Sequence, residues 1–154
     1  MKADLDNKGG DTMSLRVKID GQDSFEIAKD CVKKVMFKTD IPLDSNARTK
    51  DVGSTLEISG KVLVATDGDP FDSTRKLAMW SMVPAENAAA YRQVTVEVIN
   101  AGVVERKYSF SRAFVVDYKE DYGNTDGIGT FKIIIKQKKD KLDQIAIEGG
   151  YTGA

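Results

Sequence analysis

Two short acidic loops are the segments of this sequence that most resemble a metal site. Asp67–Asp72 contains three carboxylates, and Asp121–Gly129 contains asparagine, aspartate and glycine in the order found in the middle of a calcium-binding loop. An EF-hand loop needs an oxygen ligand at its fifth position and glycine at its sixth, where the first segment has Phe71 and Asp72. The second segment is followed by Ile133 where position twelve needs glutamate. Both are therefore interpreted as solvated turns, with ion binding as the alternative.

Residues for acid–base, nucleophilic or redox chemistry are scarce. The 154 residues include no histidine, which removes the commonest general base and the commonest zinc ligand. The single cysteine, Cys31, excludes an intrachain disulfide, and its place in the apolar run Cys31–Phe37 predicts a reduced, half-buried thiol. No serine–lysine or carboxylate pair stands out among the 24 acidic residues. The sequence therefore argues against an enzyme and predicts no catalytic residue, metal or cofactor.

Length and charge describe one soluble domain. A chain of 154 residues fits a single domain, and 23 basic against 24 acidic residues give a net charge of −1. That balance argues against bulk attraction to nucleic acid or to an anionic membrane. No apolar run approaches the roughly 18 residues of a membrane helix, and the polar N-terminus lacks the apolar segment of a signal peptide. We therefore expect a protein made inside the cell without a signal peptide.

Alternation of apolar and polar residues predicts that most of the chain is β-strand. Strong alternation occurs in Leu15–Ile19, Thr55–Ala65, Gln93–Ile99, Val103–Tyr118 and Thr130–Lys138, and weaker signals occur in 25–27, 32–38 and 142–148. The segment Val103–Tyr118 is expected to form one long strand or a bent pair. Asn100–Gly102, before it, is predicted to be a hairpin turn.

A helix is predicted in the middle of the chain. Asp72 or Ser73 can cap its N-terminus, and Leu77 and Trp80 share one helical face. Pro84–Ala90 is a candidate for a second short helical turn that begins at the proline. Six to eight strands with one helix predict a mainly β fold, an antiparallel β-sandwich or barrel with one short helix packed at the side. The expected core residues are Trp80, Val96, Phe110, Phe114, Phe131 and Ile133.

The polar segments suggest how the chain is divided. Residues 1–13 are predicted to be a flexible arm, 14–148 a single β-rich domain and 149–154 a tail. The run Lys8–Met13 can be encoded by a purine-rich ribosome-binding site followed by a start codon, so Met13 is a candidate natural start; a genuine polar arm is the alternative. Lys38–Gly53 is polar and long for a loop in a compact domain, which is typical of a functional loop.

The order of these parts resembles that of a known family. Four segments and Gly102 carry the resemblance. The segments are Asp72–Ser81 with its Lys-Leu pair, Tyr91–Ile99, the aromatic-rich Tyr108–Tyr118 with its Val-Asp-Tyr end, and Gly129–Ile135. Together they are similar to the tube proteins, which are the Hcp-type proteins of type VI secretion and the tail-tube proteins of contractile phages. The resemblance spans Ser14 to about Glu148.

The resemblance implies a structural role. It implies subunits that form hexameric rings and stack into the inner tube of a phage-tail-like or type VI-like injection machine, assembled from protein made in the bacterial cytoplasm. The expected partners are further copies of the chain and the sheath, baseplate or spike proteins of the same machine, with nucleic acid only as cargo in the lumen. The loop between early strands would contact the next ring, through Ile41, Pro42, Leu43, Arg48 and Lys50.

A second interpretation comes from a different class of protein. The chain would then be a monomeric small β-barrel that binds a ligand or a carbohydrate. This interpretation predicts an apolar pocket near Trp80. The two interpretations differ in oligomeric state, because only the first requires copies of the chain to associate.

Overall fold

The computed structural model describes residues 13–40, 53–123, 128–137 and 146–152. Its strands are β1 (Met13–Asp20), β2 (Phe25–Glu26), β3 (Val32–Asp40), β4 (Gly53–Val62), β5 (Arg92–Asn100), β6 (Val103–Tyr122), β7 (Gly129–Gln137), β8 (Ala146–Glu148) and β9 (Tyr151–Thr152). Between β4 and β5 lie the helix α2 (Ser73–Ser81) and the 3₁₀ turns η2 (Ala65–Asp67) and η3 (Ala88–Ala90). The predicted class, mainly β with one short helix, is confirmed. In these ranges, no helix is long and apolar enough to cross a membrane.

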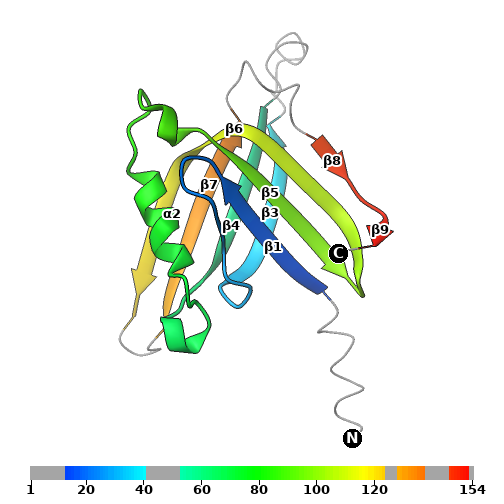
Figure 1. The fold of residues 1–154 in the computed structure, drawn as a ribbon, viewed down its shortest axis with the longest axis horizontal. Coiled ribbons are helices and arrows are strands. Elements are labelled where there is room, and N and C mark those ends of the chain that lie inside the picture. The colour runs from blue at the N-terminus through cyan, green and yellow to red at the C-terminus, as the bar shows by residue number, and fades with distance from the viewer. Residues whose placement is uncertain (1–12, 41–52, 124–127, 138–145, 153–154) are drawn as a thin grey trace, which may run out of the picture.

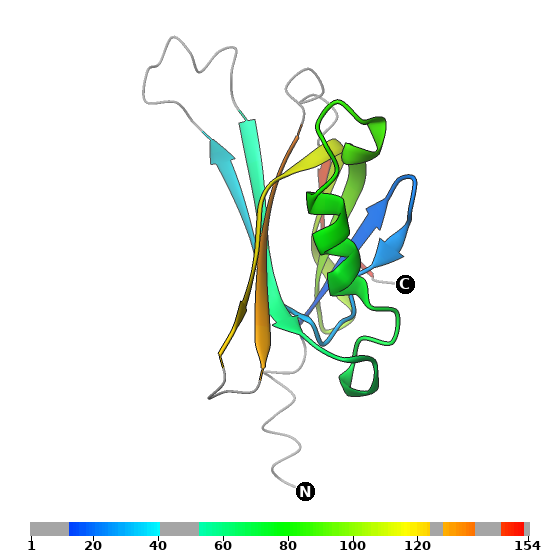
Figure 2. The same cartoon turned by 90° about the vertical axis from the view of Figure 1, so that its left-hand side faces the viewer.

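The strands form two layers that share β6. The order is β2-β1-β5-β6-β7-β4-β3, and β8 and β9 also pair with β6; every pair is antiparallel. Residues 103–113 of β6 pair with β5, and residues 113–122 pair with β7. Seen from the side, β3, β4, β7 and the end of β6 form one layer, and β1, β5 and the beginning of β6 form the other (Figure 2). The helix α2 lies along one side of the two layers and contacts β6 and β2 (Figure 1).

The core lies between the two layers. Alternate residues of β1, β4, β5 and β7 point into it, as the period of two predicts. Five of the expected core residues are buried, with exposed fractions of 2% or less: Trp80, Val96, Phe110, Phe131 and Ile133. Trp80 also has a partner for its polar atom, because Nε1 donates a 2.9 Å hydrogen bond to the carbonyl oxygen of Ala90.

Phe114 does not belong to the core, so the prediction for this residue was wrong. It is half-buried and lies outside the buried cluster, because β6 bends before it. Arg112 has a φ of 53°, which interrupts the alternation of side chains along the strand. Phe110 and Ala113 are therefore both buried although they are three residues apart. One long bent strand, rather than a bent pair, occupies this part of the chain.

The helix begins at Ser73, but its cap differs from the prediction. Asp72 precedes it with a φ of 56°, and its side chain makes no capping hydrogen bond. The buried Asp69 caps the helix instead. Its carboxylate accepts hydrogen bonds from the backbone N–H of Ser73 at 2.9 Å and of Thr74 at 3.3 Å, and from both hydroxyl groups. The loop that looked most like a metal site thus serves to start the helix.

Smaller differences occur at element ends. The 3₁₀ turn η3 begins at Ala88 and not at Pro84, because Asn87 Oδ1 accepts a 2.9 Å hydrogen bond from the N–H of Ala89 and so starts the turn there. Strand β1 includes Met13, and β9 lies inside the segment that was expected to be a tail. The hairpin turn predicted after β5 is confirmed, with positive φ at Ala101 and Gly102.

Candidate functional site

Among the described residues, the layer made by β3, β4, β7 and the end of β6 is a four-stranded sheet with two free edges. β7 and β4 each pair on both sides, whereas β4 is the one described strand with which β3 pairs. Beyond Ala113, β6 pairs with β7 and with no other strand that the structure describes. Each edge therefore presents backbone N–H and C=O groups that have no strand partner in the part of the chain described here. Such edges are ready templates for pairing with another chain.

β3 presents a basic edge, which consists of Lys33, Lys34 and Lys38. All three side chains are exposed. The pairing of β3 with β4 shifts between Val32 and Lys34, and Lys33 is the extra residue of this β-bulge. None of the three lysines forms a salt bridge with another described residue. The charges of Lys33 and Lys34 are therefore available to a partner, and the charge of Lys38 also attracts the carboxylate of Asp40, which is bound to Lys136.

The acidic residue of β3, Asp40, is neutralised within the sheet. Lys136 Nζ donates a 2.7 Å hydrogen bond to Asp40 Oδ2, and Thr55 Oγ1 donates one of 2.8 Å to the same oxygen. Partial burial acts to raise the pKa of Asp40, but the hydrogen bonds from Lys136 and Thr55 outweigh it, so the pKa is lowered. The carboxylate stays charged and bound to Lys136. The net charge that β3 presents thus comes from its lysines.

The end of β6 presents an acidic edge, which consists of Asp117, Glu120 and Asp121, with one basic residue, Lys119, among them. All four side chains are exposed, and the acidic ones are in excess. Glu120 accepts hydrogen bonds from the hydroxyl groups of Tyr118 and Tyr122 on the same strand. Burial, and then the hydrogen bond to Glu120, raise the pKa of Tyr118, so its hydroxyl remains a donor. Asp117 and Asp121 form no salt bridge with any residue that the structure describes.

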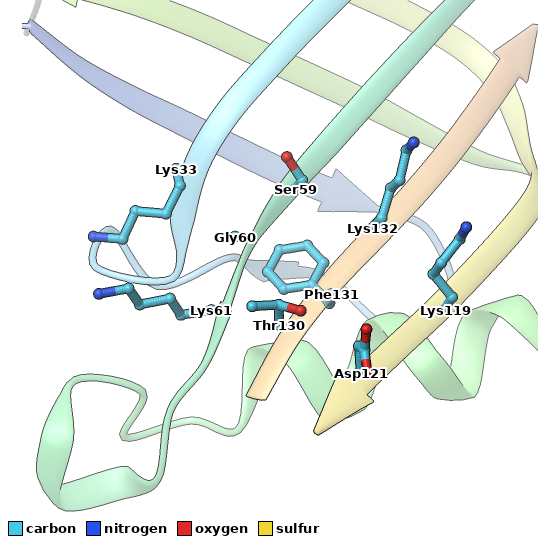
Figure 3. Close-up of a pocket in the computed structure, with 9 residues that line it drawn as sticks. All are labelled: Lys33, Ser59, Gly60, Lys61, Lys119, Asp121, Thr130, Phe131 and Lys132. Carbon is cyan, nitrogen blue, oxygen red and sulfur yellow. The ribbon is translucent and has the colours of Figure 1, made fainter. Parts of the chain in front are cut away.

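A groove of about 430 Å³ lies between the two edges, at one end of the sheet. It is lined by Lys33, Ser59, Gly60, Lys61, Lys119, Asp121, Thr130, Phe131 and Lys132. The ammonium groups of Lys33 and Lys61 extend to one side, and those of Lys119 and Lys132 extend in another direction (Figure 3). Because the four cations do not converge, the groove has no single point at which a small anion would be held.

A second cavity lies next to the helix, where the ligand-binding interpretation expects a pocket. It is lined by Trp80, Ser81, Val83, Ala85, Ala90, Tyr91, Phe114 and Val115, and its volume is about 190 Å³. Pockets for drug-sized ligands are usually about 300–1,000 Å³. The Trp80 ring is almost fully buried, and its N–H is already bound to Ala90. The cavity is therefore small for a ligand or a sugar.

Cys31 is not placed to act as a nucleophile. It is fully buried, which goes beyond the half-buried thiol that the sequence predicted. Burial and the nearby charge of Asp69 raise the pKa of the thiol to about 11. A thiol with this pKa is protonated at neutral pH. Among the described residues, no three histidine, cysteine, aspartate or glutamate side chains are grouped as metal ligands would be.

The loop residues expected to stack rings lie outside the described part of the chain. They are Ile41, Pro42, Leu43, Arg48 and Lys50. The residues that flank this loop are described: Asp40 and Gly53 are directly paired at the end of β3 and β4. The assignment of the loop to ring stacking stays a prediction.

Comparison with solved structures finds proteins of the same architecture, whereas comparison with protein families and curated proteins finds no match. Among solved structures, Hcp1 from Flavobacterium johnsoniae matches with a TM-score of 0.56 and 18% identity, over 92% of this chain and 99% of that one. The chain has the fold of an Hcp-type tube protein.

Two further solved structures also match the fold of this chain. A type six secretion system protein matches with a TM-score of 0.53 and 14% identity, over 82% of this chain and 80% of that one. A chain of the sheath-tube complex of an extracellular contractile injection system, PVC, matches with a TM-score of 0.51 and 10% identity, over 88% of each chain. The fold predicted from the resemblance is therefore confirmed.

Sequence reasoning missed the two charged edges. Their signals are visible in the sequence, as the consecutive lysines at 33 and 34 and the acidic run between Asp117 and Asp121. Neither run shows by itself that its strand lies at the margin of a sheet. That information comes from the pairing of strands far apart in the chain.

Proposed function

We propose that this chain is a structural subunit that forms closed rings, which stack into the inner tube of a contractile injection machine. The observation that carries the proposal is the Hcp-type fold with a four-stranded sheet free at both edges. Free edges are a liability in a monomer, and a closed ring of copies removes all of them. The resemblance to the Hcp family makes six the expected number of subunits.

The direction of the strands supports closure of the sheet by copies of the chain. The four strands alternate in direction from the end of β6 through β7 and β4 to β3. Because their number is even, β3 runs opposite to β6. A copy rotated about an axis parallel to the strands therefore brings its β6 antiparallel to the β3 of its neighbour. Antiparallel pairing can thus continue from subunit to subunit without interruption.

Two experiments test this function directly: size exclusion with light scattering, which measures the mass of the assembly, and negative-stain electron microscopy. Purified protein is expected to elute from size exclusion at the mass of a ring, and negative-stain images are expected to show rings or tubes with a central hole. A monomer across a wide range of concentrations would contradict the proposal. In the same machine, we expect sheath and baseplate proteins as partners and the residues between Asp40 and Gly53 as the contact to the next ring.

A further inference from the structure

We propose that neighbouring subunits are joined in one register by their opposite charges, with the basic edge of β3 on one copy against the acidic edge of β6 on the next. This inference rests on the proposed ring-forming function. It names the residues that choose which edges meet and how they align. The occupant of each edge is a second copy of this chain, because the two edges carry complementary charge at opposite margins of one sheet.

The charges in the middle of the sheet are already paired, in contrast to those at its margins. Lys132 on β7 lies 3.2 Å from Glu57 on β4, and Lys136 is bound to Asp40 at 2.7 Å. On the edges, the exposed lysines of β3 and the two aspartates of β6 have no such partner among the residues described. The unpaired charges are therefore placed where a neighbouring copy would meet the sheet.

Strand pairing fixes which residues lie level with one another. Lys34 pairs with Ser59, Ser59 with Lys132, and Lys132 with Lys119, so these four residues form one row across the sheet. A neighbouring copy docked without a shift would continue this row and place its Lys119 opposite Lys34. Like charges directly opposite each other destabilise an antiparallel pair, so the unshifted register is disfavoured.

A shift of two residues replaces this repulsion by two ion pairs. In the antiparallel register that sets Lys34 opposite Asp121, Lys38 lies opposite Asp117. Directly opposite residues point to the same face, and Lys34 and Lys119 share one face of the sheet through their row. Asp117 and Asp121 are each two residues from Lys119 and so share that face. A stagger of this kind is also what a sheet needs in order to close into a barrel.

The same charges act against other assemblies. Two basic edges repel each other, and so do two acidic edges, so a symmetric dimer made through identical edges is disfavoured. The remaining contact joins the basic edge of one copy to the acidic edge of the next. Such a contact is head-to-tail, because the two copies contribute different surfaces to it. Repeated head-to-tail contacts close into a ring when the rotation between copies allows it. The edges thus favour a ring over a two-fold dimer.

Charge reversal with mixing tests the proposal. In one variant Lys34→Glu and Lys38→Glu make both edges acidic, and in another Asp117→Lys and Asp121→Lys make both edges basic. Each variant alone is expected to lose the ring of the unaltered protein, because the staggered register then sets like charges opposite each other. An equimolar mixture is expected to regain rings, because the unlike edges can then alternate around an even-membered ring. Light scattering and negative-stain microscopy measure both results.

Two controls keep the outcome clear. Lys29→Glu with Arg106→Glu makes the same change of charge at exposed residues outside the four-stranded sheet that form no salt bridge with a described residue, and this variant is expected to form rings like the unaltered protein. The variant that carries all four edge reversals in one chain is expected to assemble alone. Circular dichroism establishes that each variant folds; if a reversal variant does not fold, Lys34→Gln with Lys38→Gln is expected to assemble with weaker dependence on salt than the unaltered protein.

The failure of this inference is distinguishable from that of the proposed function. Rings from the unaltered protein together with rings from each reversal variant alone would overturn the charge pairing and leave the tube function standing. Folded reversal variants that stay monomeric when mixed, or salt dependence unchanged by the neutral variant, would also overturn it. If the unaltered protein forms no ring at all, the proposed function itself fails.

Discussion

Phe114 packs edge-on against Tyr91, with ring centroids 6.0 Å apart and ring planes at 64°. This contact lies beside the helix and outside the buried cluster that holds Phe110. Both phenylalanines belong to β6, and the left-handed backbone of Arg112 separates them. The bend thus places Phe110 in the core and Phe114 beside the helix, although both belong to one strand.

The bend in β6 predicts that two similar substitutions, one on each side of it, lower the free energy of unfolding by different amounts. Phe110→Ala is expected to lower the free energy of unfolding by about 3–5 kcal/mol, because it opens a cavity in a fully buried site. Phe114→Ala is expected to cost about half as much, since that ring is already partly exposed. Urea denaturation of both variants gives the comparison. Equal losses would mean that Phe114 belongs to the core after all.

The cap of the helix gives a second prediction. Asp69→Ala is expected to lower the free energy of unfolding by about 2 kcal/mol, because it leaves the buried N–H and hydroxyl groups of Ser73 and Thr74 without their acceptor. Asp72→Asn is the matched control and is expected to change little, since Asp72 makes no capping bond and asparagine tolerates its positive φ. Thermal melts of the two variants should differ clearly; a larger loss at position 72 would contradict this assignment of the cap.

Alternation in the sequence was enough to predict most strands and the fold class. Segments such as Leu15–Ile19 and Gly129–Gln137 have one buried face, and a buried face leaves a period of two in the sequence. The class follows from the number of such segments. The hairpin turn at Asn100–Gly102 was predictable for a similar reason, because its residues are local and their backbone preferences are strong.

Features that depend on distant contacts were not predictable in this way. Asp67, Asp69 and Asp72 are all acidic residues near the start of the helix, and only the tertiary structure buries Asp69 and turns it toward the N–H groups. The outward turn of Phe114 depends on one unusual backbone angle at Arg112. The charged edges depend on strand order, which sequence periodicity does not contain.

The β-bulge at the start of β3 gives a third prediction. A Cβ at Gly60 would lie 1.7 Å from the carbonyl oxygen of Cys31, which accepts a 2.8 Å hydrogen bond from the N–H of Lys61. Gly60→Ala is therefore expected to cost about 2–3 kcal/mol of stability, because backbone and not a flexible side chain must move. Gly123→Ala is the control and should be tolerated, since no atom lies within 4 Å of its Cβ position. Urea midpoints that fall equally would contradict the prediction.

The buried thiol gives a prediction about pH. The pKa of Cys31 is raised from 9.0 to about 11 in the folded protein, so the folded state holds the proton more tightly than the unfolded state. Its contribution to stability is complete below pH 9 and is lost as the pH rises toward 11. The free energy of unfolding is therefore expected to fall less steeply in Cys31→Ala than in the unaltered protein between about pH 9 and about pH 11. Parallel curves would show that the thiol is not the group responsible.

The loop between β3 and β4 gives the last prediction, which separates the contacts within a ring from those between rings. Because Asp40 and Gly53 are directly paired, a short turn that replaces Ile41–Lys50 can connect the two strands without disturbing either charged edge. The shortened protein is expected to fold and to form rings, but the rings should no longer stack into tubes under conditions in which the unaltered protein does.

Microscopy of rings and tubes measures this result, and a matched control separates the chemistry of the loop from its length. In the control, serine and glycine replace Ile41, Pro42, Leu43, Arg48 and Lys50 and the number of residues is kept. If specific side chains make the contact, the control should fail to stack as well. Tubes that persist in the shortened protein would remove the loop from the stacking interface. Loss of the rings together with the tubes would instead place the loop between neighbours in the same ring, and stacking would then have to rest on the ends of the sheet itself.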